Sequence, residues 1–145
     1  HTILRRQRQM CIRDRITAPR FERETPSNQP LKMVFVVNHA LKMGRGKIAA
    51  QVGHAAVKAT LKSGEVRPEL LDAWLSTGQK KICVKANDSS HIDEIEKQAN
   101  QLRILSVKIN DAGHTQIPSG SLTVLALGPD EEEKLDELTG ELKLL

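Results

Sequence analysis

Two short stretches of the sequence combine residue types that could do chemistry. The first, GRGKIAAQVGHA (residues 44–55), carries Lys47, Gln51 and His54. These positions are i, i+4 and i+7, so on a helix the three polar side chains share one side. The second, DAGHTQIPSGSLT (residues 111–123), holds a carboxylate and several hydroxyls that could orient a water or hydrogen-bond an ester carbonyl. Because Asp, Gly, Pro and Ser also favour turns, the residue types alone leave a plain turn open.

The glycines of GRGK do not form a phosphate-binding loop. A P-loop requires G-x-x-x-x-G-K-[ST], whereas Lys47 is followed by Ile48 and no hydroxyl is offered to Mg²⁺. A dinucleotide fingerprint is also incomplete, since its third glycine and its ribose-binding acid are missing. A nucleotide-binding enzyme is therefore not expected. What remains is a glycine-bearing loop that leads into a helix N-terminus, which can attract anions.

Each polar residue of the first stretch also has an interpretation without function. His54 could be a structural histidine, and Lys47 could be an exposed lysine at a helix start. A lysine there is mildly unfavourable, because it lies at the positive end of the helix dipole. That cost makes a nearby anion attractive, and Asp111 is the candidate partner.

Other chemistries lack their residues. The five histidines show no metal-ligand spacing with cysteines or acids, and there is no G-x-S-x-G motif. The aromatic residues Phe21, Phe35 and Trp74 are too few for a base-stacking platform. Cys11 and Cys83 form no disulfide framework, which favours a reduced, intracellular setting. No apolar run approaches the ~18 residues that a transmembrane helix requires.

The elements that must position these residues follow from hydrophobic periodicity, Pro and Gly. We expect strands at 33–38, 80–86, 105–110 and 121–128, helices at 46–62, within 63–78 and at 88–103, an acidic helix that Pro129 opens and that runs to about 139, and an extended end at 140–145. This order predicts an α/β domain with helices on both faces of a mixed sheet. The polar loop at 111–121 is the expected functional segment.

Charge and composition divide the chain at about residue 32. Residues 1–31 hold seven arginines and three acids without apolar periodicity, so we expect a disordered extension. Its RRQRQMCIRDR run resembles translated sequencing adapter, which favours a sequencing or annotation artefact over a basic arm that binds nucleic acid. Residues 32–145 form the expected domain. In it, residues 32–85 carry ten basic residues against three acids, and the remainder five against twelve. Such asymmetry fits a basic face for a polyanion, or ordinary solvated surfaces.

The motifs together resemble one family. The segments MVFVVNHALKMGRGKIAAQVGHAA, GQKKICVKA, DAGHTQIPSGSLTVLALGP and TGELKLL are similar, in order and without large gaps, to the type II (archaeal and eukaryotic) peptidyl-tRNA hydrolases. The resemblance covers residues 33–145. It implies a three-layer α/β/α sandwich on a four-stranded mixed sheet, a homodimer in many members and no cofactor or metal. It also implies a cytoplasmic protein, with mitochondrial association in eukaryotic relatives.

The resemblance further implies hydrolysis of the ester between a peptide and the 3′ ribose of tRNA. By the same resemblance, the catalytic residues are Lys47, Asp111, Thr115 and Thr123, with Gln51 and His54 as secondary candidates. Asp111 would orient Lys47 and a water, and the two threonines would donate hydrogen bonds to the substrate or the oxyanion. The basic residues expected to contact tRNA phosphates are Lys42, Arg45, Lys80, Lys81 and Lys85.

The sequence also departs from the family pattern. Asn38 and Ala40 stand where relatives commonly have Arg and Asp, and His114 replaces the usual basic residue after DAG. The loss of this Arg/Asp pair beside the site puts substrate positioning or rate in question. The alternative function is a non-enzymatic protein-interaction module on the same fold.

Overall fold

The computed structural model describes residues 29–112 and 120–145 of the chain. Its elements in chain order are β1 (Leu31–Asn38), the 3₁₀ turn η1 (His39–Leu41), α2 (Arg45–Val66), α3 (Pro68–Ser76), β2 (Lys81–Ala86), α4 (Ser89–Gln101), β3 (Ser106–Asn110), β4 (Leu122–Glu131) and α5 (Glu132–Thr139). The expected extension, apart from its last three residues, lies outside this part of the chain. None of the described helices is long and apolar enough to cross a membrane.

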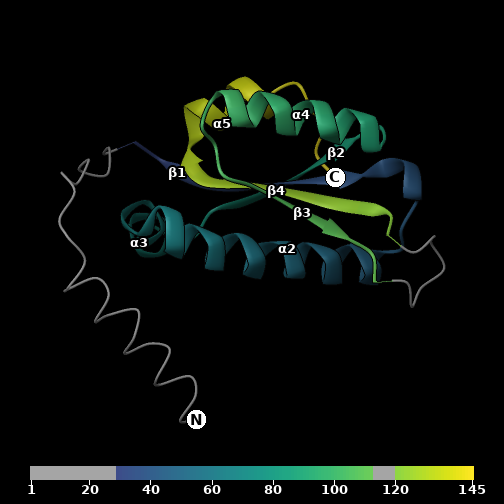
Figure 1. Cartoon of the computed structure of the whole chain (residues 1–145), viewed down its shortest axis with the longest axis horizontal. Coiled ribbons are helices and arrows are strands. Elements are labelled where there is room, and N and C mark those ends of the chain that lie inside the picture. The colour runs from purple at the N-terminus through teal and green to yellow at the C-terminus, as the bar shows by residue number, and fades with distance from the viewer. Residues whose placement is uncertain (1–28, 113–119) are drawn as a thin grey trace, which may run out of the picture.

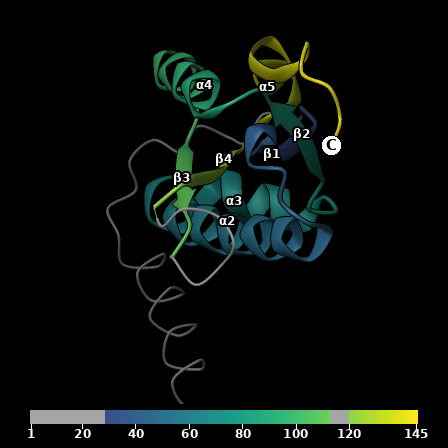
Figure 2. The same ribbon diagram turned by 90° about the vertical axis from the view of Figure 1, so that its right-hand side faces the viewer.

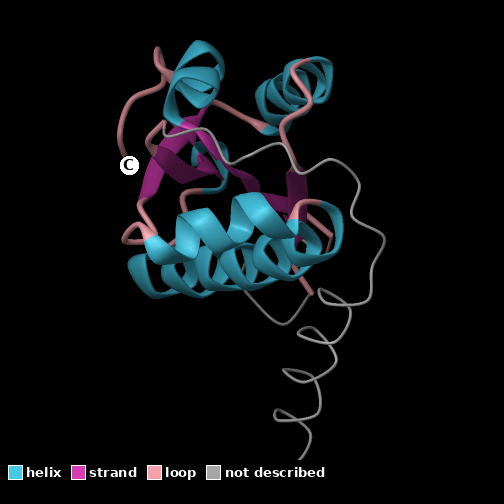
Figure 3. Cartoon of the chain, turned by 90° about the vertical axis from the view of Figure 1, so that its left-hand side faces the viewer, coloured by secondary structure: helices cyan, strands magenta, loops and turns pink. Residues whose placement is uncertain are grey.

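The four strands form one mixed sheet in the order β2-β1-β4-β3. Strand β1 is parallel to β2 and antiparallel to β4, and β3 is antiparallel to β4. Helices α2 and α3 cover one face, and α4 and α5 cover the other (Figure 1). Seen from the left-hand side of Figure 1, the sheet lies between the two helix layers (Figure 3). The predicted three-layer α/β/α sandwich is confirmed.

Strand β1 lies at the centre of this sandwich because its sequence, LKMVFVVN, can be buried on both faces. Every residue of β1 is buried, as expected for a central strand with helices on both sides. Successive side chains of a strand point to opposite faces. Accordingly Met33, Phe35 and Val37 belong to the core under α2 and α3, whereas Val34 and Val36 belong to the core under α4 and α5.

Helices α2, α3 and α4 begin and end close to where the sequence predicted. Pro68 is the first residue of α3, where its missing N–H costs nothing. Asp88 caps α4 through its side chain, which accepts a hydrogen bond from the His91 N–H at 2.8 Å. Helix α2 continues four residues past the expected end and stops at Val66. Arg67, which follows, precedes Pro68, and a residue before proline disfavours the helical conformation.

The prediction that Pro129 opens the last helix is wrong. Pro129 lies inside β4, after a cis Gly128–Pro129 peptide bond, and α5 starts only at Glu132. Pairing of β4 with β1 shifts register between Lys32 and Val34, and it then continues to Leu31 opposite Glu131. Proline cannot donate a backbone hydrogen bond, so an irregular point of the ladder is where a strand tolerates it.

The two edges of the sheet are protected differently. Along β2, the end of the chain adds an extended segment, with Leu144 bridging to Val84 and the Lys85 N–H donating to the Lys143 carbonyl at 2.9 Å. Of the extended segment expected at 140–145, only residues 143–145 run beside β2, since residues 140–142 form a turn after α5. At the other edge, β3 carries lysine side chains from α2 instead of a further strand. Both devices cover backbone groups that would otherwise be free to pair with another chain.

Candidate active site

Four segments of the chain meet at one end of the sheet, which faces the viewer in Figure 2. Val124 of β4 pairs with Val37 of β1 on one side and with Ile109 of β3 on the other. The ends of β1 and β3 therefore lie beside the beginning of β4. The N-terminus of α2 follows shortly after β1 and packs against the same end. Residues that are far apart in sequence, 38–47, 109–111 and 120–124, are thus brought together.

Lys47 and Asp111 form the central contact of this site. Lys47 Nζ lies 2.6 Å from Asp111 Oδ1, which confirms the proximity expected from the sequence. The Asp111 side chain is 2% exposed and that of Lys47 is 20% exposed. A buried carboxylate needs hydrogen bonds and a compensating charge, and an ammonium at this distance supplies both. The pair therefore fixes the lysine head group at the edge of the site.

Backbone hydrogen bonds hold Asp111 in place. Its N–H donates to the Ser121 carbonyl at 2.8 Å, and its own carbonyl accepts from the Gly120 N–H at 3.0 Å. Gly120 has a φ of 81°, a left-handed conformation that glycine adopts without steric cost. The connection between β3 and β4 is therefore closed at its base, directly beside the carboxylate.

Thr123 and Gln51 form a second, fully enclosed contact. Thr123 Oγ1 lies 3.0 Å from Gln51 Oε1 and 3.0 Å from the carbonyl oxygen of Ile109. A hydroxyl has one proton, so it can donate to only one of these acceptors. Both contacts are satisfied when the Gln51 amide is turned so that its nitrogen donates to Thr123 and the hydroxyl donates to Ile109. Thr123 is 0% exposed, so its hydroxyl joins α2 to the sheet and does not reach solvent.

Of the remaining predicted catalytic residues, the structure describes His54 alone. His54 shares the polar side of α2 with Lys47 but is exposed, and it lies about 60° around the helix axis from the buried Gln51. Thr115 and the substituted His114 lie outside the described residues. The role expected for Thr115 therefore stays a prediction.

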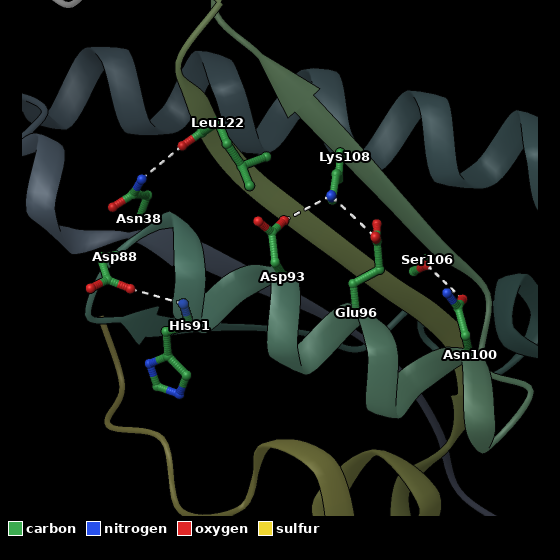
Figure 4. A network of polar contacts seen from close by, with 9 residues as sticks. All are labelled: Asn38, Asp88, His91, Asp93, Glu96, Asn100, Ser106, Lys108 and Leu122. Carbon is green, nitrogen blue, oxygen red and sulfur yellow. Dashed lines mark hydrogen bonds and ion pairs between the residues drawn. The ribbon is translucent and has the colours of Figure 1, made fainter.

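Asn38 is a site residue that sequence reasoning treated only as a departure from the family. It is buried, and its Nδ2 donates to the Leu122 carbonyl at 2.9 Å, a contact drawn in Figure 4. Its Oδ1 accepts the Ala40 N–H at 3.1 Å and so caps η1. An amide that follows an apolar strand and precedes a turn is a signal for such a cap. Asn38 thereby ties the end of β1 to the start of β4.

The basic residues expected to bind tRNA are divided between the two ends of the sheet. Lys42 and Arg45 are exposed at the site end, and Lys85 pairs with Val37 near the end of β1. Lys80 and Lys81 lie at the opposite end of β2. There Lys80 contacts Glu132, and the Lys81 ammonium lies 4.9 Å from the centre of the Trp74 ring.

The described residues offer neither a metal cluster nor an activated thiol. No group of three His, Cys, Asp or Glu side chains among them could hold a metal ion. Cys83 lies half-buried on β2, and burial raises the pKa of its thiol. A raised pKa keeps the sulfur protonated at neutral pH, so Cys83 is a packing residue here.

Comparison with known proteins assigns the family. The family model described as peptidyl-tRNA hydrolase PTH2 matches residues 31–145. A peptidyl-tRNA hydrolase of Thermoplasma acidophilum is 47% identical over 114 residues, which are 79% of this chain and 97% of the relative. One of Methanocaldococcus jannaschii is 44% identical over 115 residues, 79% of this chain and 100% of the relative. A mitochondrial peptidyl-tRNA hydrolase 2 of Bos taurus is 47% identical over 113 residues, 78% of this chain and 63% of the relative. The chain belongs to the peptidyl-tRNA hydrolase PTH2 family.

Proposed function

We propose that this protein hydrolyses the ester bond between the peptide and the 3′ ribose of peptidyl-tRNA, releasing free peptide and tRNA. Family membership and the names of the relatives support this activity. The single observation of the structure that carries it is the buried contact between Asp111 and Lys47 beside the N-terminus of α2. No finding favours the alternative of a non-enzymatic interaction module.

In the proposed mechanism a water attacks the ester carbonyl, and Asp111 orients both this water and Lys47. Negative charge develops on the carbonyl oxygen as the tetrahedral intermediate forms. A fixed ammonium, such as that of Lys47, stabilises this charge more than a mobile one, because it does not have to reorient during the reaction. The C–O bond to the ribose then breaks, the ribose oxygen takes up the proton that the attacking water gave up, and the hydroxyl from the water remains on the peptide as its carboxyl group. An ester permits this route without a covalent nucleophile, since its alkoxide leaves more readily than an amine.

The threonines have different proposed roles. Thr115 remains the candidate donor to the substrate or the oxyanion. Thr123, whose hydroxyl is enclosed, positions Gln51 and through it the first turns of α2. Gln51 is therefore a positioning residue in this proposal. His54 is exposed and lies about two helical turns along α2 from Lys47, so it is not included in the mechanism.

We propose that tRNA approaches the end of the sheet that carries Lys42, Arg45 and Lys85. These side chains lie at the same end as Lys47, and among the described residues none of the three has an ion pair. Lys80 and Lys81, which are at the other end and have partners, become weaker candidates.

The cellular setting that we propose is the cytoplasm, although one relative is named as mitochondrial. The assembly that we propose is a homodimer, and light scattering would test it by measuring the molar mass in solution.

The test of the catalytic proposal is turnover of an N-acetylated aminoacyl-tRNA. Lys47→Ala and Asp111→Ala should each lower kcat by at least roughly 100-fold, the usual contribution of a positioned acid–base or electrostatic group. Far-ultraviolet circular dichroism should show that both variants remain folded. Lys97→Ala and Glu94→Ala, exposed residues of α4, are the matched controls and should retain full activity. Near-normal turnover by both site variants would refute the assignment.

A further inference from the structure

The polar side of α2 continues well beyond Lys47. His54, Lys58 and Lys62 follow at positions that stay within roughly 60° of Lys47 around the helix axis. All three are exposed. We call these three residues the basic side of α2. Glu65 is the one acidic residue of this helix, which carries four lysines and arginines in total.

The two lysines of the basic side lie against the free edge of the sheet. Lys58 Nζ donates to the carbonyl of Lys108 at 3.2 Å, and Lys62 Nζ donates to the carbonyl of Ser106 at 3.4 Å. An ammonium has three N–H donors, so each lysine retains protons for another acceptor. Neither lysine has an ion pair with a carboxylate in the part of the chain that the structure describes. Their charge is therefore available to a polyanion along the β3 edge.

A surface hollow of about 220 Å³ extends this positive surface between α2 and the end of α4. Its lining includes Lys62, Arg67 and Arg103 and contains no carboxylate. Arg67 is committed to Asp130, at 3.3 Å, and to the Arg103 carbonyl. Lys62 and the exposed Arg103 therefore remain as the cations that can receive a ligand.

The opposite helix layer has the reverse charge. Helices α4 and α5 carry seven acidic residues against two lysines. The hollow between these two helices, of about 290 Å³, is lined by Glu94, Glu137 and Glu141. A nucleic acid held at the site end would be repelled by this layer and attracted to the basic side of α2.

We propose that the basic side of α2, together with Arg103, binds the sugar–phosphate backbone of peptidyl-tRNA beyond its 3′ end. The proposal rests on the proposed function, since it assumes that the ester lies at Lys47. A rise of 1.5 Å per residue places Lys58 and Lys62 about 16 Å and 22 Å from Lys47 along the helix. They would therefore contact nucleotides several positions from the ester. These contacts supply affinity and orientation but take no part in the reaction.

A purely structural role for the same lysines is the competing interpretation. Lysines on an edge strand or over it discourage pairing with another chain, and the contacts to Ser106 and Lys108 have that geometry. A structural role predicts lower stability or aggregation when the lysines are removed. Only a contact with RNA predicts a change in KM that depends on the length of the substrate and on the salt concentration.

The experiment compares Lys58→Gln/Lys62→Gln with the wild-type chain on two substrates, N-acetylated aminoacyl-tRNA and N-acetyl-aminoacyl-adenosine. Loss of two phosphate contacts should raise KM for the tRNA substrate roughly three- to tenfold and reduce the slope of log KM against log salt by about 1.4 to 1.8. We expect kcat to be unchanged on both substrates and KM to be unchanged for the adenosine ester. The matched control is Lys97→Gln/Lys134→Gln, which removes the same charge from α4 and α5.

Three results would overturn the inference: an unchanged KM and salt slope, an equal change in the control variant, or a lower melting temperature with unchanged KM. Failure of the proposed function looks different, because the wild-type chain would then hydrolyse neither substrate. Binding of deacylated tRNA, measured directly, tests the basic side of α2 even in that case. A dissociation constant raised in Lys58→Gln/Lys62→Gln, and not in the control, supports it.

Discussion

At the scale of single residues, the candidate site is held together by side chains that are almost or completely buried. Asp111 is almost fully enclosed, and its partner Lys47 reaches it from the first turn of α2. Thr123 is enclosed completely, although the resemblance assigned it a direct contact with the substrate. Its hydroxyl instead connects β4 to α2 through Gln51. The hydroxyl therefore determines where the start of α2, and so Lys47, lies relative to Asp111.

Thr123→Val tests this positioning role. Valine matches threonine in shape but leaves the Gln51 amide and the Ile109 carbonyl without the hydroxyl, which should lower the free energy of unfolding by about 1–3 kcal/mol. Because Lys47 would shift with α2, kcat should also fall, by roughly 10- to 100-fold, with little change in KM. Thr123→Ser keeps the hydroxyl, so it should restore kcat at a cost of about 1 kcal/mol for the lost methyl group. Urea denaturation and steady-state kinetics measure both effects. A Val variant with normal kcat would show that the contact with Gln51 is not needed.

At the scale of elements, the irregular end of β4 depends on Gly128. Its φ is +93°, and an added Cβ would lie 2.8 Å from the Asp130 nitrogen and 3.0 Å from the Lys32 carbonyl oxygen. These are backbone atoms of paired strands and cannot move aside. Gly128→Ala should therefore destabilise the protein by about 2–4 kcal/mol, since strain and overlap add.

Gly53 provides the matched control in α2. An added Cβ there meets nothing within 4 Å, and alanine is favoured over glycine in a helix interior. Gly53→Ala should stabilise the protein by about 0.5–1 kcal/mol. The two variants differ from the wild type by the same methyl group, so opposite shifts of the urea midpoint are expected. A Gly128→Ala variant as stable as the wild type would contradict the account of β4.

Lys108 connects β3 to α4 and predicts a pH dependence. Figure 4 draws its contacts with Asp93 and Glu96, which lie 2.8 Å and 3.1 Å from the ammonium. These carboxylates raise the pKa of Lys108 above its ordinary value of 10.5. A pKa raised in the folded state adds stability below the ordinary pKa and loses it as the pH rises through the folded value. Lys108→Gln should therefore lower the free energy of unfolding by about 0.2–1 kcal/mol between pH 7 and 9.

The difference in the free energy of unfolding between Lys108→Gln and the wild type should shrink above a pH of roughly 11. Urea denaturation at a series of pH values measures it. Other lysines titrate in both proteins and cancel from the comparison. The exposed Lys97 of α4 serves as the control, and Lys97→Gln should show no such trend. A constant difference across the whole pH range would exclude the two carboxylates as its cause.

At the scale of the whole molecule, features that depend on the sequence of one element could be predicted. Features that depend on pairing between distant segments could not. The apolar run in β1, the proline that begins α3 and the Asp88 cap of α4 act locally, and the structure confirms them. Pro129 signalled a helix start, but the pairing of β4 with β1 overrides that local preference. Likewise, the spacing of Lys47, Gln51 and His54 was read correctly, but the direction of the buried side depends on how α2 packs on the sheet. The helix-dipole argument named Asp111 as a candidate partner of Lys47, but the contact itself depends on how α2 and β3 meet at the end of the sheet, which no local pattern could have fixed.

The boundary of the folded unit gives the final prediction. The Pro30 carbonyl accepts the Glu132 N–H at 2.9 Å and Leu31 is buried, so the folded unit includes residues from about 30 onward. A chain that begins at residue 29 should therefore keep the melting temperature and kcat of the full chain. Removal of residues 1–34 is the contrasting deletion, since it takes away half of the central strand β1 and should leave an unfolded protein. Kinetics on N-acetylated aminoacyl-tRNA adds a second readout, because residues 1–28 contain seven arginines. A KM that rises on deletion of 1–28, with a weaker dependence on salt, would show that this segment contacts tRNA and is not an inert extension.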